Sequence, residues 1–353
     1  MDVHHRRLQA FVKLGDFLNS YCEYVSQGGQ SIENQNDWFS KLDDAIVLAG
    51  HKNGWFTKKN ILFSIENWAK LLTNEKLNNW LSDYDLKKNS PNNVALIMAG
   101  NIPLVGFPDF LAVLLTGNTA LVKSSSNDFV LLPFITEFLI KKEPSLAKAI
   151  IFKEDRFTDF DKVIATGSNN TARYFEYYFG KVPNIIRKNR NSVAVLNGFE
   201  SSEQLKALGE DIFRYYGLGC RNVSKIFVPK GYDFDSFFKA LYPFKEIIEQ
   251  VKYANNYDYN KAVYLMSEFD FLDNGFLMLK RDDSFASPIA TLFYEEYDDL
   301  DAMKARLESD TEKIQCVVGS GILPNEILFG QTQKPQLDDY ADGIDTVEFL
   351  LKT

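Results

Sequence analysis

The chain has 353 residues, with 39 basic and 48 acidic side chains and a formal net charge of −9. This length accommodates two domains or one large α/β unit with a sizeable core. The acidic excess repels phosphate backbones and anionic bilayers, so we expect neither nucleic acid nor a membrane surface as a partner.

Histidine and cysteine are scarce: the chain has only His4, His5, His51, Cys22, Cys220 and Cys316. A Ser-His-Asp or Cys-His hydrolase would have to take its base from the first 51 residues. The odd, widely spaced cysteines offer neither a zinc knuckle nor a disulfide framework, so we expect no metal. The N-terminus lacks the apolar run of an export signal, and polar residues interrupt the most apolar stretch. We therefore expect a cytoplasmic protein with no membrane span.

Hydrophobic spacing predicts a helical region followed by an α/β region. Over residues 1–90, apolar side chains recur at three- and four-residue steps from Leu8 onward. From residue 94, short apolar runs alternate with amphipathic segments, which indicates βαβ units and mainly parallel sheets. The predicted strands are 94–98, 120–122, 162–165, 193–196, 225–228, 262–266, 289–293, 316–318 and the final run 346–351. The predicted helices are 107–115, 128–142, 170–179, 203–216, 235–241 and 300–308.

Cys220 is the first candidate for chemistry. Gly217 and Gly219 precede it in YYGLGCRNVSKIFV, between an amphipathic segment and a β-branched run. This pattern predicts a tight turn in which a cofactor or another chain segment can approach closely. A small buried side chain with no reactivity is an equally good interpretation of the local sequence.

Three further candidates follow predicted strands. Asn101 lies in the Gly-Asn-X-Pro turn after 94–98, where its amide could stabilise an oxyanion or simply support the turn. Lys123 ends the next strand before the hydroxyl-rich Ser124–126 segment, and it is either a nucleotide contact or a solvated charge. The 166–168 turn, Thr-Gly-Ser, precedes a helix, and Ser168 is either near a pyrophosphate or a plain N-cap.

The order of these four motifs resembles that of the aldehyde dehydrogenase superfamily over residues 90–320. The resemblance rests on GNIPLVGFPDFLAVLLTGNTALVKSSS, TGSNNTA, GLGCRNVSKIFV and PIATLFYEEYDDLDAMKARL. Within that superfamily, the GNIP turn and the tail FGQTQKPQLDDYADGIDTVEFL are most similar to the fatty acyl-CoA reductase (LuxC-type) branch. The resemblance implies an aldehyde dehydrogenase-like α/β fold.

The resemblance also implies domains. Residues 1–90 would be a helical region packed on a nicotinamide cofactor-binding domain at 91–197, and residues 198–322 a catalytic cysteine domain. Residues 323–353 would be a tail carrying an oligomerisation strand, which predicts a homo-oligomer.

Carried over by position, Cys220 falls on the nucleophile and Asn101 on the oxyanion-hole amide. Lys123 falls on the ribose-contacting lysine, and Gly167 and Ser168, with Thr166 before them, on the turn near the cofactor pyrophosphate. Ser126 stands where NAD enzymes of the family often have a Glu that binds the adenosine ribose and would repel a 2′-phosphate. The resemblance therefore implies NADPH, with NADH as the alternative.

The water-activating Glu of hydrolytic family members is missing, because its position is taken by Ile186 in NIIRKNRNS. This loss favours acyl reduction over aldehyde oxidation to acid. We therefore expect reduction of a fatty acyl-CoA to the aldehyde through an acyl-Cys220 thioester. With no His in the site, Arg221 or a helix terminus would favour the thiolate.

The alternatives are an aldehyde dehydrogenase or acyl-phosphate reductase of the same fold, a cofactor-independent cysteine acyltransferase or thioesterase, and a non-catalytic assembly partner. The basic cluster at Arg187, Lys188 and Arg190 is either a solvated strand edge or a contact for CoA. The sequence does not define acyl chain length.

Overall fold

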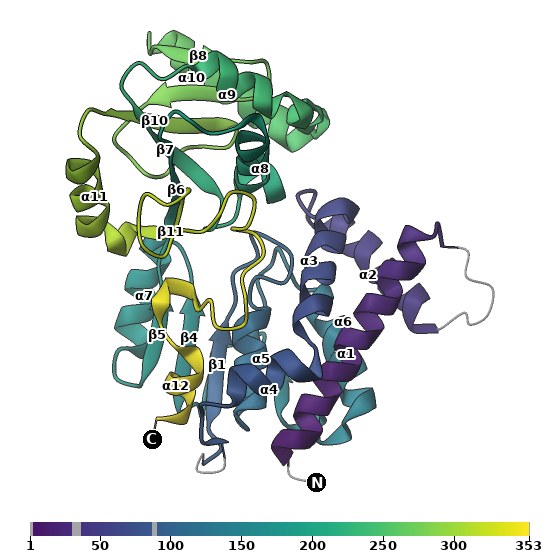
Figure 1. The fold of residues 1–353 in the computed structure, drawn as a ribbon. Coiled ribbons are helices and arrows are strands. Elements are labelled where there is room, and N and C mark those ends of the chain that lie inside the picture. Colours follow the sequence, from purple (N-terminus) through teal and green to yellow (C-terminus); the bar gives the residue numbers. More distant parts are fainter. Residues whose placement is uncertain (1–2, 30–36, 87–89, 353) are drawn as a thin grey trace. The chain divides into compact units, whose positions relative to one another are not determined.

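The computed structural model describes residues 3–29, 37–86 and 90–352, and the chain divides into two compact units (Figure 1). The first unit is Met1–Lys188 together with Gln336–Thr353, and the second is Asn189–Pro335. The chain therefore passes from the first unit to the second after residue 188, nine residues before the boundary predicted after residue 197. The tail beyond residue 335 groups with the first unit.

The N-terminal region is helical, as predicted. Its helices are α1 (Val3–Ser26), α2 (Asp37–Lys52), α3 (Lys58–Leu71) and α4 (Asn74–Leu81). Their apolar faces share one core with the helices of the adjoining sheet. The ring of Phe107, for example, lies 6.2 Å from that of Phe11 and 4.6 Å from that of Trp68, both edge-to-face. The N-terminal helices thus contribute to the core of the first unit.

The first sheet has five parallel strands in the order β3-β2-β1-β4-β5. They are β1 (Asn93–Ile97), β2 (Thr119–Lys123), β3 (Ile150–Phe152), β4 (Lys162–Thr166) and β5 (Asn184–Arg187). The crossover helices are α5 (Phe107–Leu115), α6 (Leu131–Lys142) and α7 (Asn169–Phe179). The central strands are buried on both faces, as a parallel sheet covered by helices requires.

The second unit is built on a six-stranded sheet in the order β11-β6-β7-β10-β9-β8, in which only β8 runs antiparallel to its neighbour. Its strands are β6 (Asn191–Val195), β7 (Val223–Pro229), β8 (Phe271–Asp273), β9 (Met278–Arg281), β10 (Thr291–Tyr297) and β11 (Ile314–Val318). Its helices are α8 (Ser202–Phe213), α9 (Phe234–Leu241), α10 (Val251–Met266) and α11 (Leu300–Ser309). The predicted α/β class with mainly parallel sheets is confirmed.

Two strand predictions are wrong. Residues 262–266 form the last turn of α10, whose buried side chains Tyr253, Tyr257, Asn260 and Tyr264 follow helical spacing. The predicted oligomerisation strand at 346–351 is the helix α12 (Thr346–Leu351). The Asp345 carboxylate caps α12 by accepting from the Glu348 N–H at 2.8 Å.

At the other end of α12, the buried Lys162 ammonium donates to the Leu350 carbonyl at 2.8 Å and to the Phe349 carbonyl at 3.2 Å. A cation at a helix C-terminus satisfies carbonyls that the helix itself leaves unpaired. The helical form of α12 therefore depends on a lysine from β4, which is distant in sequence. The strand predicted to mediate a homo-oligomer does not exist.

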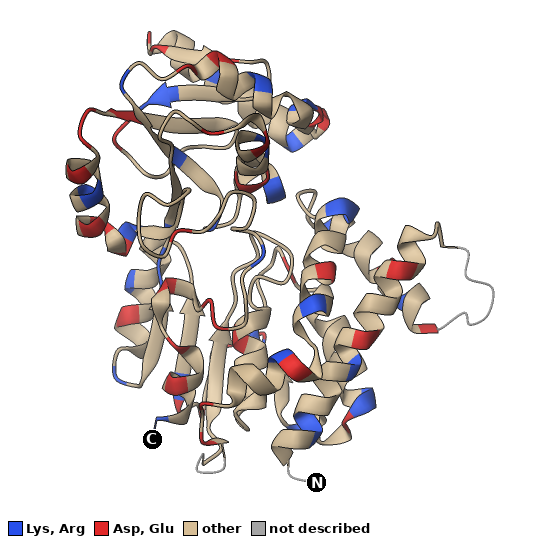
Figure 2. Ribbon diagram, in the orientation of Figure 1, with Lys and Arg blue, Asp and Glu red and all other residues tan. Residues whose placement is uncertain are grey.

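Charge of both signs is distributed along the helices. On α11, the sequence LDAMKARLES places the basic Lys304 and Arg306 between the acidic Asp301 and Glu308 (Figure 2). No helix within the described residues is long and apolar enough to cross a membrane.

Candidate active site

The carboxyl edge of the first sheet gathers most of the predicted site residues. The chain leaves β1 through α5 toward β2 on one side, whereas β4 and β5 lie on the other side of β1. Such a reversal of strand order is where open α/β sheets bind ligands, just beyond the carboxyl ends of the strands. Asn101 follows β1, Lys123 ends β2, and Thr166 ends β4. The fold thus brings three separate motifs to one edge.

The loop that carries Asn101 is fixed by its backbone. Leu104 has a left-handed backbone (φ 59°), and its N–H donates to the Asp128 carboxylate at 3.0 Å. The buried Ser64 hydroxyl donates to the Pro103 carbonyl at 3.1 Å. A Cβ at Gly100 would lie 2.5 Å from the Ser125 hydroxyl, so only glycine fits there. These anchors hold the loop while Asn101 itself is exposed.

Asp128 is the acidic group behind this loop. Burial raises the pKa of its carboxyl to about 6, an effect opposed by the Leu104 N–H bond. Its Oδ1 is buried without a hydrogen-bond partner among the described residues, and so is the Ser124 hydroxyl. Sequence reasoning missed Asp128 because its burial depends on the approach of two loops that lie far apart in sequence.

The remaining first-unit candidates are accessible to differing degrees. Lys123 and Thr166 are half-buried, and Ser126 is exposed in the turn after β2. Ser168 is the N-cap of α7, because its hydroxyl accepts from the Thr171 N–H at 3.2 Å. A Cβ at Gly167 would lie 3.0 Å from the Phe175 ring, a tight contact that requires a small shift of the ring. The structure therefore shows Ser168 acting as the N-cap of α7, one of the two roles expected for it.

In the second unit, Cys220 is exposed on the turn between α8 and β7, as predicted. Three consecutive residues before it, Tyr215, Tyr216 and Gly217, have left-handed backbones with φ of 54°, 60° and 76°. For tyrosine this conformation is costly, so it persists only where surrounding contacts enforce it. This strained stretch ends three residues before the candidate nucleophile.

Two polar side chains enforce the turn. The buried Asn222 accepts from the Gly219 N–H at 2.8 Å and donates to the carbonyls of Asp211 and Arg214 at 3.0 and 2.8 Å. The buried Ser192 hydroxyl donates to the Cys220 carbonyl at 2.9 Å. These bonds join the end of α8, the turn and β6 into one rigid support for Cys220.

The basic cluster of the sequence is accounted for by protein contacts. Arg187 is buried at the end of β5, where it forms a two-bond ion pair with Asp109 of α5 and donates to the Thr346 hydroxyl at 3.2 Å. Lys188 pairs with Glu176 at 2.7 Å. Arg190 donates to two backbone carbonyls of the second unit. Arg187 is therefore a structural cation rather than an open contact for CoA.

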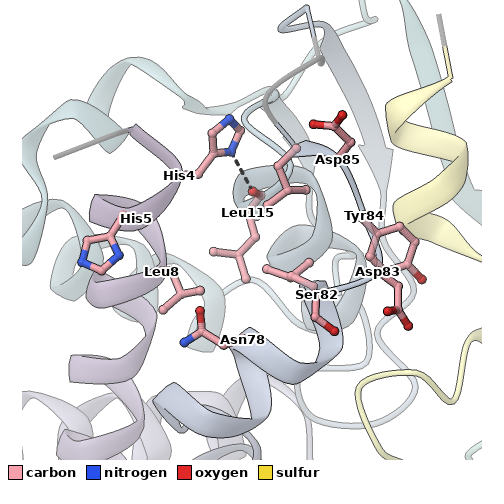
Figure 3. A pocket seen from close by; sticks show the side chains of 11 residues that line it. His4, His5, Leu8, Asn78, Ser82, Asp83, Tyr84, Asp85 and Leu115 are labelled. Carbon is pink, nitrogen blue, oxygen red and sulfur yellow. Dashed lines mark hydrogen bonds between the residues drawn. The ribbon is translucent and has the colours of Figure 1, made fainter.

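A cavity of about 630 Å³ in the first unit contains none of the predicted residues (Figure 3). It is lined by His4, His5, Asp83, Asp85 and Leu115 among others, and His4 contacts the Leu115 carbonyl at 3.2 Å. Leu115 ends α5, just before β2 begins, so this cavity lies toward the amino edge of the sheet. We do not assign it to the site.

The carboxyl edge fits a nicotinamide dinucleotide by the chemistry of its donors. Lys123 supplies a cation, Thr166 and Ser126 supply hydroxyls, and α7 presents its N-terminus there. Segment 153–156 after β3 reads Lys-Glu-Asp-Arg and adds no net charge. No group of three metal-ligating side chains occurs in the part of the chain that the structure describes.

Comparison with solved structures defines the fold as that of aldehyde dehydrogenases. Aldehyde dehydrogenase 21 from Physcomitrella patens, in complex with the reaction product succinate, is 11% identical with a TM-score of 0.66, covering 99% of this chain and 84% of that chain. A cysteine-to-alanine mutant of the P. syringae indole-3-acetaldehyde dehydrogenase AldA, in complex with NAD⁺ and IAA, is 12% identical with a TM-score of 0.63, covering 94% and 75%. A cysteine-to-alanine mutant of aldehyde dehydrogenase C (AldC) from Pseudomonas syringae, with NAD⁺ and octanal, is 12% identical with a TM-score of 0.61, covering 91% of this chain and 73% of that chain.

The family model of the acyl-CoA reductase LuxC matches residues 53–243, more than half of the chain. The chain therefore belongs to the LuxC acyl-CoA reductase family, a family of oxidoreductases. No curated protein matches the sequence.

Proposed function

We propose that the protein reduces a fatty acyl-CoA to the aldehyde with NADPH, through a thioester on Cys220. The observation that carries the proposal is the exposed Cys220 on a turn held by Asn222 and Ser192, within a chain of the LuxC acyl-CoA reductase family. A rigid, accessible thiol is what a nucleophile requires.

In the first half-reaction, the Cys220 thiolate attacks the thioester carbon of the acyl-CoA. A carbon–sulfur bond to Cys220 forms, the bond to the CoA sulfur breaks, and CoA leaves as a thiolate. By the family resemblance, the Asn101 amide and the Cys220 N–H would donate to the oxyanion while the carbon is tetrahedral. The fixed backbone of the 100–104 loop suits this role, since a preorganised donor needs no rearrangement during the reaction.

A reduced nicotinamide supplies a hydride when it is bound. In the second half-reaction, the acyl carbon on Cys220 gains that hydride and its oxygen gains a proton, giving a thiohemiacetal. Its carbon–sulfur bond then breaks, and Cys220 is regenerated as the aldehyde leaves. Asn101 again holds the developing negative charge on oxygen.

The absence of a water-activating carboxylate supports reduction over hydrolysis. Ile186, at the position of the family's Glu, lies in β5, and the next residue, Arg187, is committed to Asp109. Neither side chain can act as a general base toward water. An acyl-Cys220 intermediate that resists hydrolysis survives long enough to be reduced.

Coenzyme choice follows from the edge of the first sheet. Lys123 offers a positive charge, and exposed Ser126 brings no negative charge to repel a 2′-phosphate. We expect a higher kcat/KM with NADPH than with NADH. A Ser126→Glu substitution should shift that preference toward NADH, because the added carboxylate accepts from a ribose hydroxyl and repels a phosphate. Steady-state kinetics with both coenzymes measures the shift.

The central experiment is mass spectrometry after incubation with acyl-CoAs of graded length and no reductant. We expect an acyl mass gain on the peptide that contains Cys220, and its dependence on chain length defines the substrate. The variant Cys220→Ala should show neither adduct nor reduction, whereas Cys316→Ala, at a buried cysteine, should retain both. Full acyl-CoA reduction by Cys220→Ala would refute the assignment. A homo-oligomer and a cytoplasmic location stay predictions.

A further inference from the structure

We propose that Asp211 is a positioning residue for the Cys220 turn, acting through the segment of residues 330–332 and the guanidinium of Arg221. The proposal rests on the proposed function, in which Cys220 is the nucleophile. All of the residues involved belong to the second unit.

Asp211 is completely buried near the end of α8, and its carboxylate accepts hydrogen bonds from one distant segment, residues 330–332. Its carboxylate accepts from the Gly330 N–H at 2.6 Å, from the Thr332 N–H at 3.0 Å and from the Thr332 hydroxyl at 2.8 Å. Three donors on one buried carboxylate fix the path of that segment, because releasing any of them leaves a polar group unpaired in the core.

The segment in turn holds the residue next to the nucleophile. The carbonyl of Thr332, itself completely buried, accepts from the Arg221 Nε at 2.7 Å. That bond sets the plane of the guanidinium one residue after Cys220. Arg221 is the chain neighbour of Cys220, and a guanidinium close to a thiol favours the thiolate, which is the form that attacks a thioester. A misplaced guanidinium would therefore make Cys220 less reactive.

Asp211 also supports the Cys220 turn through its backbone. Its backbone carbonyl accepts from the Asn222 amide at 3.0 Å, and the same amide's oxygen accepts from the Gly219 N–H. Asp211 thus contributes to both arms of support, one through its backbone to Gly219 and one through its side chain to Arg221. Only the second arm depends on the carboxylate.

This anchor lies just before a crossing between the two units. Thr332 is three residues from Pro335, the last residue of the second unit. The backbone that leaves this unit is therefore bound to the Cys220 turn before it departs. A positioning role therefore accounts for the buried carboxylate of Asp211, which takes no direct part in the proposed reaction.

The test is the rate at which iodoacetamide alkylates Cys220, followed by peptide mass spectrometry from pH 5.5 to 9 on the full chain without acyl-CoA or coenzyme. In Asp211→Asn, an NH₂ group must face either the Gly330 N–H or the Thr332 donors, so the segment shifts and releases Arg221. We expect the rate at pH 7 to fall roughly three- to tenfold and the midpoint of the pH profile to rise by about half to one unit.

Two further variants keep the test decisive if Asp211→Asn folds poorly. Arg221→Lys keeps the charge but lacks the Nε–H that Thr332 accepts, and it should give a similar shift. Combined with Asp211→Asn it should add little, because both act on one path. Thr332→Val, which loses only the hydroxyl, should give a smaller shift in the same direction.

The matched control is Leu208→Ala, which removes a fully buried side chain one turn earlier on α8. It should lower the unfolding temperature and leave the alkylation profile unchanged. Equal profiles in Asp211→Asn and the wild type, or an equal shift in Leu208→Ala, would overturn the positioning role. The two proposals can fail separately. A shift in the alkylation profile of Asp211→Asn, with no acyl adduct on the wild type from acyl-CoA, supports positioning and refutes the reductase. An acyl adduct on the wild type, with no shift in Asp211→Asn, supports the reductase and refutes positioning.

Discussion

The Asn101 loop and the Cys220 turn are each backed by an aspartate whose carboxyl is shielded from water, but the two carboxylates are bonded differently. Burial raises the pKa of both Asp128 and Asp211 to about 6. Asp128 accepts one backbone N–H and leaves its other oxygen without a partner among the described residues. Asp211 accepts three bonds, through both oxygens. Ionisation therefore costs stability at both sites, but at Asp211 three hydrogen bonds offset part of that cost, whereas at Asp128 only one does.

The largest effect expected on either side of this comparison is that of Asn101→Ala. Removing one oxyanion donor typically lowers kcat by about 10²- to 10³-fold, and we expect that loss for acyl-CoA reduction. Alkylation of Cys220 by iodoacetamide should be unchanged, because that reaction forms no oxyanion. Steady-state kinetics and alkylation rates measure the two quantities. A parallel fall in both would show that Asn101 acts on the thiol itself.

The next effect is on the stability of Asp211→Asn. Because an amide cannot accept from donors on both sides, at least one buried donor is left unpaired, and we expect the free energy of unfolding at pH 7.5 to fall by about 2–3 kcal/mol. Urea denaturation measures it. An unchanged midpoint would mean that the three bonds on Asp211 contribute nothing net.

The smallest effect is expected for Asp128→Asn, which should raise the free energy of unfolding rather than lower it. The amide oxygen still accepts from the Leu104 N–H, and removal of the buried charge outweighs the unpaired NH₂ group that replaces Oδ1. The free energy of unfolding at pH 7.5 should therefore rise by about 1–2 kcal/mol. The folded pKa of Asp128 lies above its ordinary value of 3.8. Its protonated form is therefore favoured by folding, and that contribution is present below about pH 4 and is lost as the pH rises through 6.

The gain from Asp128→Asn should accordingly shrink as the pH falls from 7.5 to 4. Denaturation at several pH values measures this trend. A gain that is independent of pH would contradict the assignment of its origin to the charge. If Asp128→Asn and Asp211→Asn both destabilised the protein equally, the contrast drawn between the two carboxylates would be wrong.

Most of the α/β framework was predictable because the short-range spacing of apolar residues indicates most of its helices and strands. The spacing of residues 107–115 coincides with α5, and the buried runs near residues 94, 120 and 162 are strands. Short edge strands such as β3, β5 and β8 were missed, since three or four residues carry too little periodicity. Residues 262–266 and 346–351 were misassigned for a related reason: an apolar run of five or six residues fits a strand and a helix turn equally well.

Within the candidate site, the sequence identified groups that are at least partly accessible and missed the supporting ones. Cys220, Asn101 and Lys123 were found because they stand beside glycines or at strand ends. Asp128 and Asp211 were not, since nothing in their local sequence distinguishes a buried carboxylate from a solvated one. Each is bonded to a backbone segment distant along the chain.

By itself, the sequence determined the α/β class, the helical lead-in, the position of Cys220 on a turn and the absence of a carboxylate at residue 186, because residue types and short-range spacing suffice for these. The tertiary structure decided the helical form of α12, the burial of Arg187 against Asp109 and the bonds that hold the turns of Asn101 and Cys220. Those outcomes depend on which distant backbone groups meet a side chain away from water, and burial of that kind is a property of the packed chain.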